Sequence, residues 1–251
     1  MTREQFKEHA SLHHAEMVKR FAYNPIADGW NVIYTPESKF FEYPDKNYKF
    51  PIEVQCDDTI GAVIKQAKKS VSFIGVLNFA SFTSPGGGYM SGAHAQEEDL
   101  CHNSDLYERI SPETEFYAYN IKHKNDGAYE NRAIFSYDVN FIDPETDKEY
   151  LVDVVTCAAP NKSVGKYKTV PWNNSEILKS RIQFVLNIMQ AEDIQVPILG
   201  AWGCGVFGQD PREVARLFKE ELISGKYNFE KVIFAIPAGY NYDCFKEIIG
   251  K

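Results

Sequence analysis

Two adjacent glutamates, Glu97 and Glu98, have the residue type and spacing for acid–base chemistry. They follow a run of three glycines, Gly86-Gly87-Gly88, and stand where a helix is expected to begin. Neighbouring positions on a helix differ by about 100° in direction, so both carboxylates can face one cavity. Glycoside hydrolysis uses such a pair, one to protonate the leaving oxygen and one to stabilise the sugar cation. Acids also gather in first helical turns because the dipole favours them, so a purely structural turn is the alternative.

Two glycine-rich loops are candidates for anion binding. The first, at residues 84–92, contains the three glycines, which let the backbone approach a ligand closely. The second, at 200–208, has the sequence Gly-Ala-Trp-Gly-Cys-Gly-Val-Phe-Gly and precedes a helix start at Asp210-Pro211. A strand, such a loop and a helix N-terminus together are typical of a phosphate-binding turn. No Lys-Ser/Thr follows the glycines, which disfavours a Walker-type ATPase. The glycines of the second loop are not a GxGxxG at the first βα turn, which disfavours a dinucleotide dehydrogenase.

The first loop resembles the signature of the microbial branch of the poly(ADP-ribose) glycohydrolase family. The resemblance consists of three glycines, seven further residues and Gln96-Glu97-Glu98, with Asn78-Phe79-Ala80 before them and Leu100-Cys101 after them. It extends over about residues 71–245. In related loops an Asn or a His often precedes the glycines, where this chain has Ser81 and Ser84. The resemblance implies a macrodomain-like domain that binds ADP-ribose.

The resemblance also implies roles for individual residues. Glu98 is expected to be the general acid for the ribose–ribose O-glycosidic bond, with a pKa raised by burial beside Glu97. Glu97 is expected to hold the ribose hydroxyls and Gln96 to orient the pair. The remaining substrate-binding residues are expected in the two loops and the strand before the first: Asn78, Gly86, Gly87, Gly88, Gly203, Cys204, Gly205, Val206 and Phe207. No base is adjacent to Cys204, so we expect it to fill space rather than act as a nucleophile.

Two other functions use the same loops. A non-catalytic ADP-ribose-binding macrodomain needs the loops without the glutamates, and the intact pair favours an enzyme. A hydrolase that removes single ADP-ribose units from protein or nucleic acid is the other alternative. No cofactor or metal is expected, since His9, His13 and His14 on one predicted helix are more typical of packing than of a metal site. The expected partner is ADP-ribose or poly(ADP-ribose) on modified proteins.

The hydrophobic pattern predicts helices alternating with strands, and therefore a three-layer α/β/α macrodomain-like sandwich with a mixed central sheet. The chain is interpreted as one domain, 1–251, with residues 1–50 as a helical or irregular N-terminal extension. Ligands in open α/β sheets bind beyond the carboxyl ends of strands, so the two loops should share one pocket. Helices are predicted at 2–21, 57–69, 95–110, 175–191, 211 onward and 242–249, and strands at 31–34, 71–77, 133–141, 150–158, 196–199 and 232–236.

Composition limits the partners. The chain has 251 residues, of which 44% are hydrophobic and 25% charged, and a formal net charge of −8. That charge disfavours bulk nucleic-acid binding along a basic groove, and favours gripping one chain-terminal unit through uncharged N–H groups. No apolar run is long enough for a membrane span and no targeting segment is evident. Five spaced cysteines without a CxxC indicate reduced thiols and a cytoplasmic location. We expect a monomer.

Overall fold

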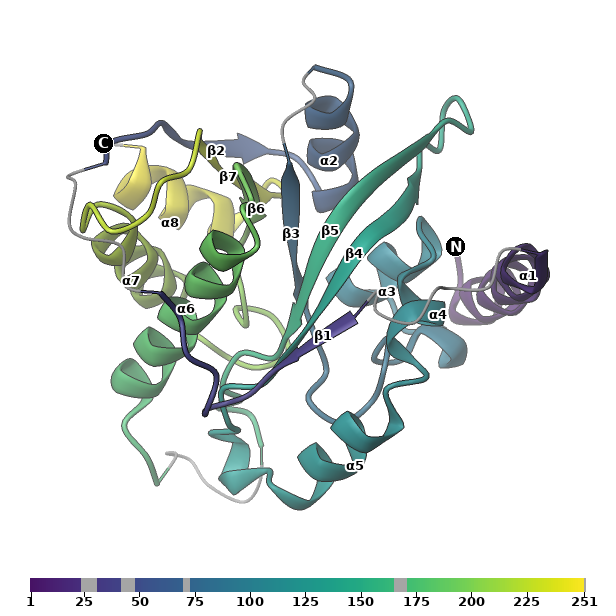
Figure 1. The fold of residues 1–251 in the computed structure, drawn as a ribbon, viewed down its shortest axis with the longest axis horizontal. Coiled ribbons are helices and arrows are strands. Elements are labelled where there is room, and N and C mark those ends of the chain that lie inside the picture. Colours follow the sequence, from purple (N-terminus) through teal and green to yellow (C-terminus); the bar gives the residue numbers. More distant parts are fainter. Residues whose placement is uncertain (24–30, 42–47, 70–72, 165–170, 251) are drawn as a thin grey trace.

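A seven-stranded mixed sheet runs through the middle of the molecule in the order β1-β4-β5-β3-β6-β7-β2 (Figure 1). The computed structural model describes residues 1–23, 31–41, 48–69, 73–164 and 171–250. Strands β2, β7, β6, β3 and β5 are parallel to one another, whereas β4 is antiparallel to β5 and β1 to β4. The strands are β1 (Asn31–Tyr34), β2 (Ile52–Cys56), β3 (Ile74–Phe79), β4 (Ala133–Ile142), β5 (Glu149–Cys157), β6 (Val196–Leu199) and β7 (Val232–Ile236).

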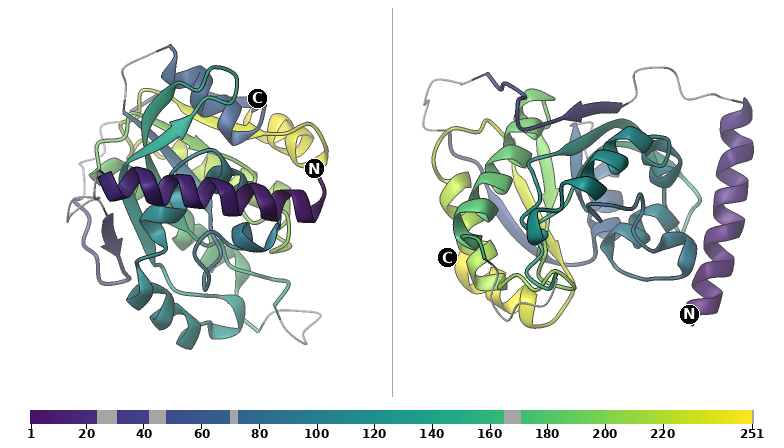
Figure 2. Two further views of the ribbon diagram at one scale, coloured as in Figure 1. Left: turned by 90° about the vertical axis from the view of Figure 1, so that its right-hand side faces the viewer. Right: turned by 90° about the horizontal axis from the view of Figure 1, so that it is seen from below.

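Helices cover both faces of this sheet, which confirms the predicted three-layer sandwich. One face carries α6 (Asn174–Ala191), α7 (Pro211–Leu222) and α8 (Tyr240–Ile249). The other carries α2 (Thr59–Ala67), α3 (Gln96–His102), α4 (Leu106–Ile110) and α5 (Thr114–Lys122). Helix α1 (Arg3–Tyr23) lies outside this second layer, at the opposite end of the molecule from α8 (Figure 2).

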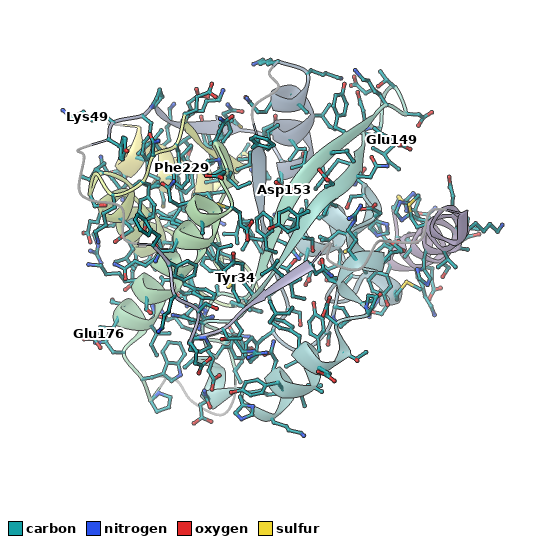
Figure 3. The ribbon with its side chains drawn as sticks, in the orientation of Figure 1. Tyr34, Lys49, Glu149, Asp153, Glu176 and Phe229 are labelled. Carbon is teal, nitrogen blue, oxygen red and sulfur yellow. The ribbon has the colours of Figure 1, made fainter. Side chains whose placement is uncertain are left out.

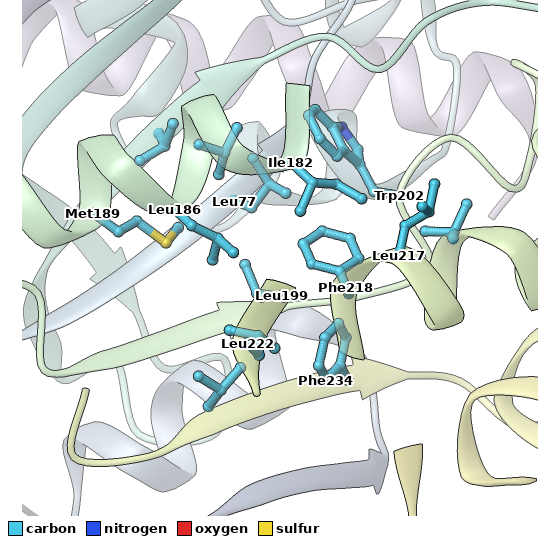
Figure 4. Close-up of a cluster of buried hydrophobic side chains, with 14 of the residues drawn as sticks. Leu77, Ile182, Leu186, Met189, Leu199, Trp202, Leu217, Phe218, Leu222 and Phe234 are labelled. Carbon is cyan, nitrogen blue, oxygen red and sulfur yellow. The ribbon is translucent and has the colours of Figure 1, made fainter. Parts of the chain in front are cut away.

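Alternating side chains on the strands fill two separate cores. In β3, Leu77 faces the core under α6 and α7, while Val76 faces the core under α2 and α3. The first core includes Trp202, which belongs to the second glycine-rich loop. Its side chain packs near Phe218 and Phe234 (Figure 4). Successive strand residues point to opposite faces, so apolar runs are required where both faces are covered.

The parallel strands deliver their loops to one edge of the sheet. The carboxyl ends of β3 and β6 are neighbours there, because the two strands pair in parallel. The first glycine-rich loop leaves β3 and the second leaves β6. Helix α7 then begins with Asp210 as its N-cap and Pro211 in its first turn, as the sequence predicts. The fold therefore brings the two loops together.

The predicted helix at 95–110 is wrong as a single element, because it is broken into α3 and α4. Ser104 lies in the break, where its hydroxyl donates to the carbonyl of Leu100 and accepts from the N–H of Leu106. The carboxylate of Asp105 points inward and accepts two hydrogen bonds from the guanidinium of Arg109. Asp105 therefore does not face solvent as it would on the surface of a continuous helix. Local side chain to backbone bonds of this kind compete with helix continuation.

Three further elements differ from prediction. The strand predicted at 71–77 is observed as Ile74–Phe79, and Val71 lies outside the described residues. Strand β2 and helix α5 were not predicted. Strand β1 is observed at 31–34 as predicted; it pairs with β4 at the sheet edge, so the segment interpreted as an N-terminal extension is part of the sheet.

Strand β1 is also fastened across the sheet to α6. The hydroxyls of Tyr34 and Tyr137 both donate to the carboxylate of Glu192, the C-cap of α6. Figure 3 shows Tyr34 on this strand. Within the described residues, no helix has the length and apolar character needed to span a membrane.

Candidate active site

Gln96 fixes the first turn of α3 against the end of β3. Its Oε1 accepts from the backbone N–H of Phe79 at 2.8 Å, and its Nε2 donates to the carbonyl of Leu77 at 2.9 Å. A side-chain amide thus continues the hydrogen bonding where the strand ends. The two residues that follow Gln96 are consequently held at a fixed height above the sheet edge.

Glu97 is buried, and both of its carboxyl oxygens are bonded within the protein. Oε2 accepts from the backbone N–H of Ser81 at 2.7 Å, and Oε1 accepts from Asn78 Nδ2 at 3.3 Å. Burial raises the pKa of Glu97 to about 8, the nearby charge of Glu98 adds to the rise, and the bond from Ser81 opposes it. Burial therefore favours the neutral form of Glu97 near pH 7.

Glu98 is bonded at one oxygen only. Its Oε1 accepts from the backbone N–H of Gly88 at 2.8 Å. Its Oε2 has no hydrogen-bond partner in the described part of the chain, and the side chain lines the cavity between the loops. One carboxyl of the pair is thus locked into the protein, and the other presents an oxygen to whatever occupies the cavity.

Gly87 allows the loop to wrap closely around both carboxylates. Its φ is +57°, in the left-handed region that favours glycine. A Cβ at this position would lie 2.5 Å from Oε1 of Glu98 and 2.9 Å from Oε2 of Glu97. Both carboxylates therefore approach one point of the loop backbone, and no larger residue fits there.

A cavity of about 300 Å³ lies between the two glycine-rich loops. This confirms that they share one pocket. The first loop and α3 contribute Ser81, Gly87, Ala95, Gln96, Glu97 and Glu98, and the second loop contributes Ala201, Trp202, Gly203, Gly205, Val206 and Phe207. Val206 is 81% exposed, so the second loop forms an open wall of this pocket.

Four residues expected at the substrate do not line this cavity. Asn78 is fully buried behind Glu97, where its amide also donates to Thr156. The thiol of Cys204 points at the carbonyl of Trp202, and burial raises its pKa to about 12, which fits space filling rather than nucleophilic attack. Gly86 packs against Tyr107. Gly88 gives its N–H to Glu98 and leaves none for an anion.

A larger cavity of about 970 Å³ adjoins the first and was not predicted from the sequence. The two cavities share Phe79, Ala95, Gln96 and Ala201 in their walls. The larger one extends over the start of α2 and the loop after β7, where Tyr240 is 65% exposed. One sequence signal could have indicated the larger cavity: Gly239-Tyr240 follow a predicted strand that ends at the same edge of the sheet as β3 and β6.

Other possible chemistry is not supported by the described residues. They contain no group of three or more His, Cys, Asp or Glu side chains arranged to hold a metal ion. The five cysteines are all free thiols, and three of them are buried. Glu97 and Glu98 are the candidates for catalysis because both line the cavity between the glycine-rich loops.

A macrodomain-like α/β/α sandwich with a carboxyl pair in a glycine-lined pocket defines a class of glycoside hydrolase. The sequence profile described as "Microbial-type PARG, catalytic domain" matches residues 11–143. The chain belongs to this family of poly(ADP-ribose) glycohydrolases. No protein with a curated description matches the sequence.

Solved structures agree with this family. A crystal structure of poly(ADP-ribose) glycohydrolase from Thermomonospora curvata bound to the inhibitor ADP-HPD is 30% identical, with a TM-score of 0.81. The match covers 97% of this chain and 99% of that chain. The enzyme from Deinococcus radiodurans in complex with ADP-ribose is 29% identical, with a TM-score of 0.75 over 88% of this chain and 94% of that one.

Proposed function

We propose that Glu98 is the general acid with which this poly(ADP-ribose) glycohydrolase cleaves the ribose–ribose O-glycosidic bond and releases ADP-ribose. The observation that carries this assignment is the difference between the two carboxyls. Both oxygens of Glu97 are bonded to Asn78 and Ser81, whereas Oε2 of Glu98 has no partner among the described residues. A proton donor must reach the leaving oxygen directly, so the carboxyl with the unengaged oxygen is the better donor.

The raised pKa of Glu97 supports a shared proton in the pair. With a pKa of about 8, Glu97 is mostly protonated at neutral pH, and it can share this proton with the adjacent Glu98. The proton passes from Glu97 to Glu98, which delivers it to the leaving ribose oxygen and afterwards takes one from the water whose oxygen attacks the anomeric carbon. Glu97, which is then ionised, accepts hydrogen bonds from the ribose hydroxyls through its remaining lone pairs. Two carboxyls with different environments can in this way divide the acid and partner roles.

The two cavities suggest how the ADP-ribose unit is bound. The distal ribose fits the smaller cavity beside Glu98, with Phe207 packing on it, and the adenosine fits the larger cavity near Tyr240. The pyrophosphate then lies at the second glycine-rich loop, close to Gly203 and Gly205. Backbone N–H groups at such a loop bind phosphate oxygens without a basic side chain.

We further propose cleavage from chain ends by a monomer in the cytoplasm. The net charge of −8 argues against a basic track along the polymer. The free thiols fit a reducing compartment. A protein that grips one unit should change its KM by less than about threefold between 50 and 200 mM salt, whereas phosphate tracking predicts losses of ~10³-fold or more.

The experiment compares Glu98→Gln and Glu98→Ala with the wild type on three substrates: poly(ADP-ribose), mono-ADP-ribosylated protein and ADP-ribosylated DNA. Both variants should lose about 10²–10⁴-fold in kcat on polymer and still bind ADP-ribose in calorimetry. Glu115→Gln is the matched control, because Glu115 is an exposed acid in the first turn of another helix. Undiminished turnover by Glu98→Ala would refute the assignment. Turnover of the mono-modified substrates alone would show that the enzyme removes single ADP-ribose units and does not cleave the polymer.

A further inference from the structure

Five of the six histidines of the chain lie at one interface, between α1 and the segment that carries the catalytic loop. Helix α1 runs along this side of the molecule as a separate rod (Figure 2). Its contacts are with α3, α4 and the short 3₁₀ turn η1 (Tyr89–Ser91). The histidines are His9, His13 and His14 on α1, His94 before α3, and His102 at the end of α3.

The bond between His9 and His102 depends on protonation. Their Nδ1 atoms are 2.9 Å apart, so one ring must donate and the other must accept. Two neutral rings or one protonated ring satisfy this bond, whereas two imidazolium rings have no acceptor and repel each other. His102 is 8% exposed, and burial together with the neighbouring histidines lowers its pKa to about 4. The docked helix therefore disfavours protonation of His102, and it is incompatible with protonation of both rings.

The same helix supports the loop that holds Glu98. Tyr89 directly follows Gly88, and its hydroxyl donates to the carbonyl of Ala10 at 3.2 Å and contacts Nδ1 of His13 at 2.9 Å. Its ring packs on His102 at 4.8 Å. The backbone of α1 also touches the far end of the turn, since a Cβ on Gly92 would lie 2.2 Å from the carbonyl of Arg3.

We propose that α1 is a positioning element for Glu98, and that protonation of the histidine interface in acid releases it. Release would free Tyr89 and thereby the N–H of Gly88 that fixes Oε1 of Glu98. This inference rests on the proposed role of Glu98. It assigns a function to the N-terminal segment, which contains none of the substrate-binding loops.

The other charged groups at the interface set the direction of the effect. His14 pairs with Glu108 on α4 at 2.9 Å, and His94 pairs with Asp99 on α3 at 2.6 Å. Protonation strengthens these two pairs and opposes release. Arg3 and Lys7 on α1 add positive charge beside η1, where Arg3 donates to the carbonyl of Ser91. Burial raises the pKa of Tyr89 and of Tyr107, so both stay neutral. His102 is buried and has no carboxylate partner among the described residues, so its ring decides the balance.

Acid should weaken docking in a defined range. Between the ordinary histidine pKa of about 6.5 and the value of about 4 for docked His102, each pH unit weakens docking by up to about tenfold. Docking of α1 weakens with falling pH only in the range where His102 is protonated in the released state and neutral in the docked state. Below this range the docking equilibrium stops changing through His102.

The test follows hydrogen exchange of α1 and of residues 88–92, corrected for intrinsic rates, together with kcat and ADP-ribose affinity from pH 7.5 to 5. In the wild type both segments should gain exchange together as pH falls, with kcat falling and ADP-ribose affinity unchanged. His102→Asn removes the titrating ring, so its exchange should no longer depend on pH in this range and its acid limb in kcat should be shallower. His123→Asn is the matched control, because His123 stacks on Tyr119 of α5 instead.

Tyr89→Phe removes one hydroxyl and keeps the ring, so it tests the connection without unfolding the loop. It should lower kcat several-fold at pH 7.5 and leave ADP-ribose affinity unchanged. Acid release of α1 while residues 88–92 stay protected would overturn the proposal, and so would a wild-type acid limb in His102→Asn. A protein that exchanges as expected but cleaves no polymer at any pH would instead refute the proposed function.

Discussion

The backbone N–H of Ser81 donates a 2.7 Å hydrogen bond to Oε2 of Glu97, and this bond holds a carboxyl that burial keeps largely neutral. The protein thus maintains an acidic side chain inside the fold at a position where its charged form is disfavoured. Such an arrangement is unfavourable for stability at neutral and basic pH. The proposed mechanism requires Glu97 as a partner for Glu98, so a substitution of Glu97 should raise stability and lower activity.

Glu97→Gln should stabilise the protein at basic pH and abolish most turnover. The pKa of Glu97 rises from 4.5 to about 8 on folding, so the stability present below pH 4.5 is lost as pH increases toward 8. The variant does not suffer this loss, and its advantage in the free energy of unfolding should reach about 1–3 kcal/mol at pH 9. Thermal unfolding at pH 5 and pH 9 measures it. A difference in melting temperature that is the same at both pH values would contradict the raised pKa.

Gly87→Ala should damage the site more than the fold. The added Cβ would meet Oε1 of Glu98 and Oε2 of Glu97, at a φ of +57°. We expect a loss of kcat of at least about tenfold, and a loss of stability of about 1–3 kcal/mol. In a Glu98→Ala background the closest clash is absent, so the stability loss from Gly87→Ala should be smaller there. Fully additive losses in this double-mutant cycle would show that strain at φ alone is responsible.

Tyr240→Ala should weaken ADP-ribose binding without affecting the fold. The ring is 65% exposed and lines the larger cavity, so its removal leaves no buried void. Loss of aromatic contact with adenine corresponds to about 1 kcal/mol, or five- to tenfold in Kd. Calorimetry with ADP-ribose measures the change, and Tyr119→Ala on α5 is the control for loss of an exposed ring elsewhere. Unchanged ADP-ribose affinity in Tyr240→Ala would show that adenosine does not bind beside Tyr240 in the larger cavity.

Arg181→Met should weaken both the fold and the pocket wall. The guanidinium is 1% exposed and donates to the carbonyls of Ala158 and Ala128 and to Oδ1 of Asn131. Removing these donors leaves buried carbonyls unpaired, which we expect to lower the free energy of unfolding by about 2–4 kcal/mol. Ala159, which follows Ala158 in the chain, lines the smaller cavity between the glycine-rich loops, so ADP-ribose affinity should fall as well.

Arg109→Met provides the comparison for that prediction. Arg109 is another buried guanidinium, bonded to Asp105 on the far side from the second glycine-rich loop. Its loss should destabilise the protein by a similar amount, with ADP-ribose affinity unchanged. Equal losses of affinity in both variants would mean that Arg181 acts only through general stability.

The sequence was most informative where one residue determines the local structure. Asp210 caps α7, as its position before Pro211 predicts, and Asp58 caps α2 at the start of the helix predicted at 57–69. The central strands were found from apolar runs, because strands covered on both faces must be apolar throughout. Strand β2 was missed because, at the edge of the sheet, it has Glu53 and Gln55 among its five residues and no apolar run.

The site was predicted by motif, but its internal division of roles was not. Nothing in the order of Glu97 and Glu98 shows that Ser81 and Asn78 occupy both oxygens of the first. The break between α3 and α4 depends on inward-facing Asp105, whose carboxylate accepts from the backbone N–H of Asn140 in β4, a tertiary contact that periodicity does not contain. The larger cavity is formed by α2 and the loop after β7, segments distant in the chain, and single-sequence patterns do not encode such proximity.

The pairing of β3 with β6 has a consequence for how the enzyme acquires its site. One glycine-rich loop leaves each of these strands, and β4, β5 and α6 lie between them along the chain. Joining them requires closure of a long segment, which is slow and gains little until the sheet centre is complete. A nascent chain that ends before β6 therefore carries both glutamates yet has no pocket. Polymer cleavage begins only once the C-terminal half of the protein has been synthesised and folded.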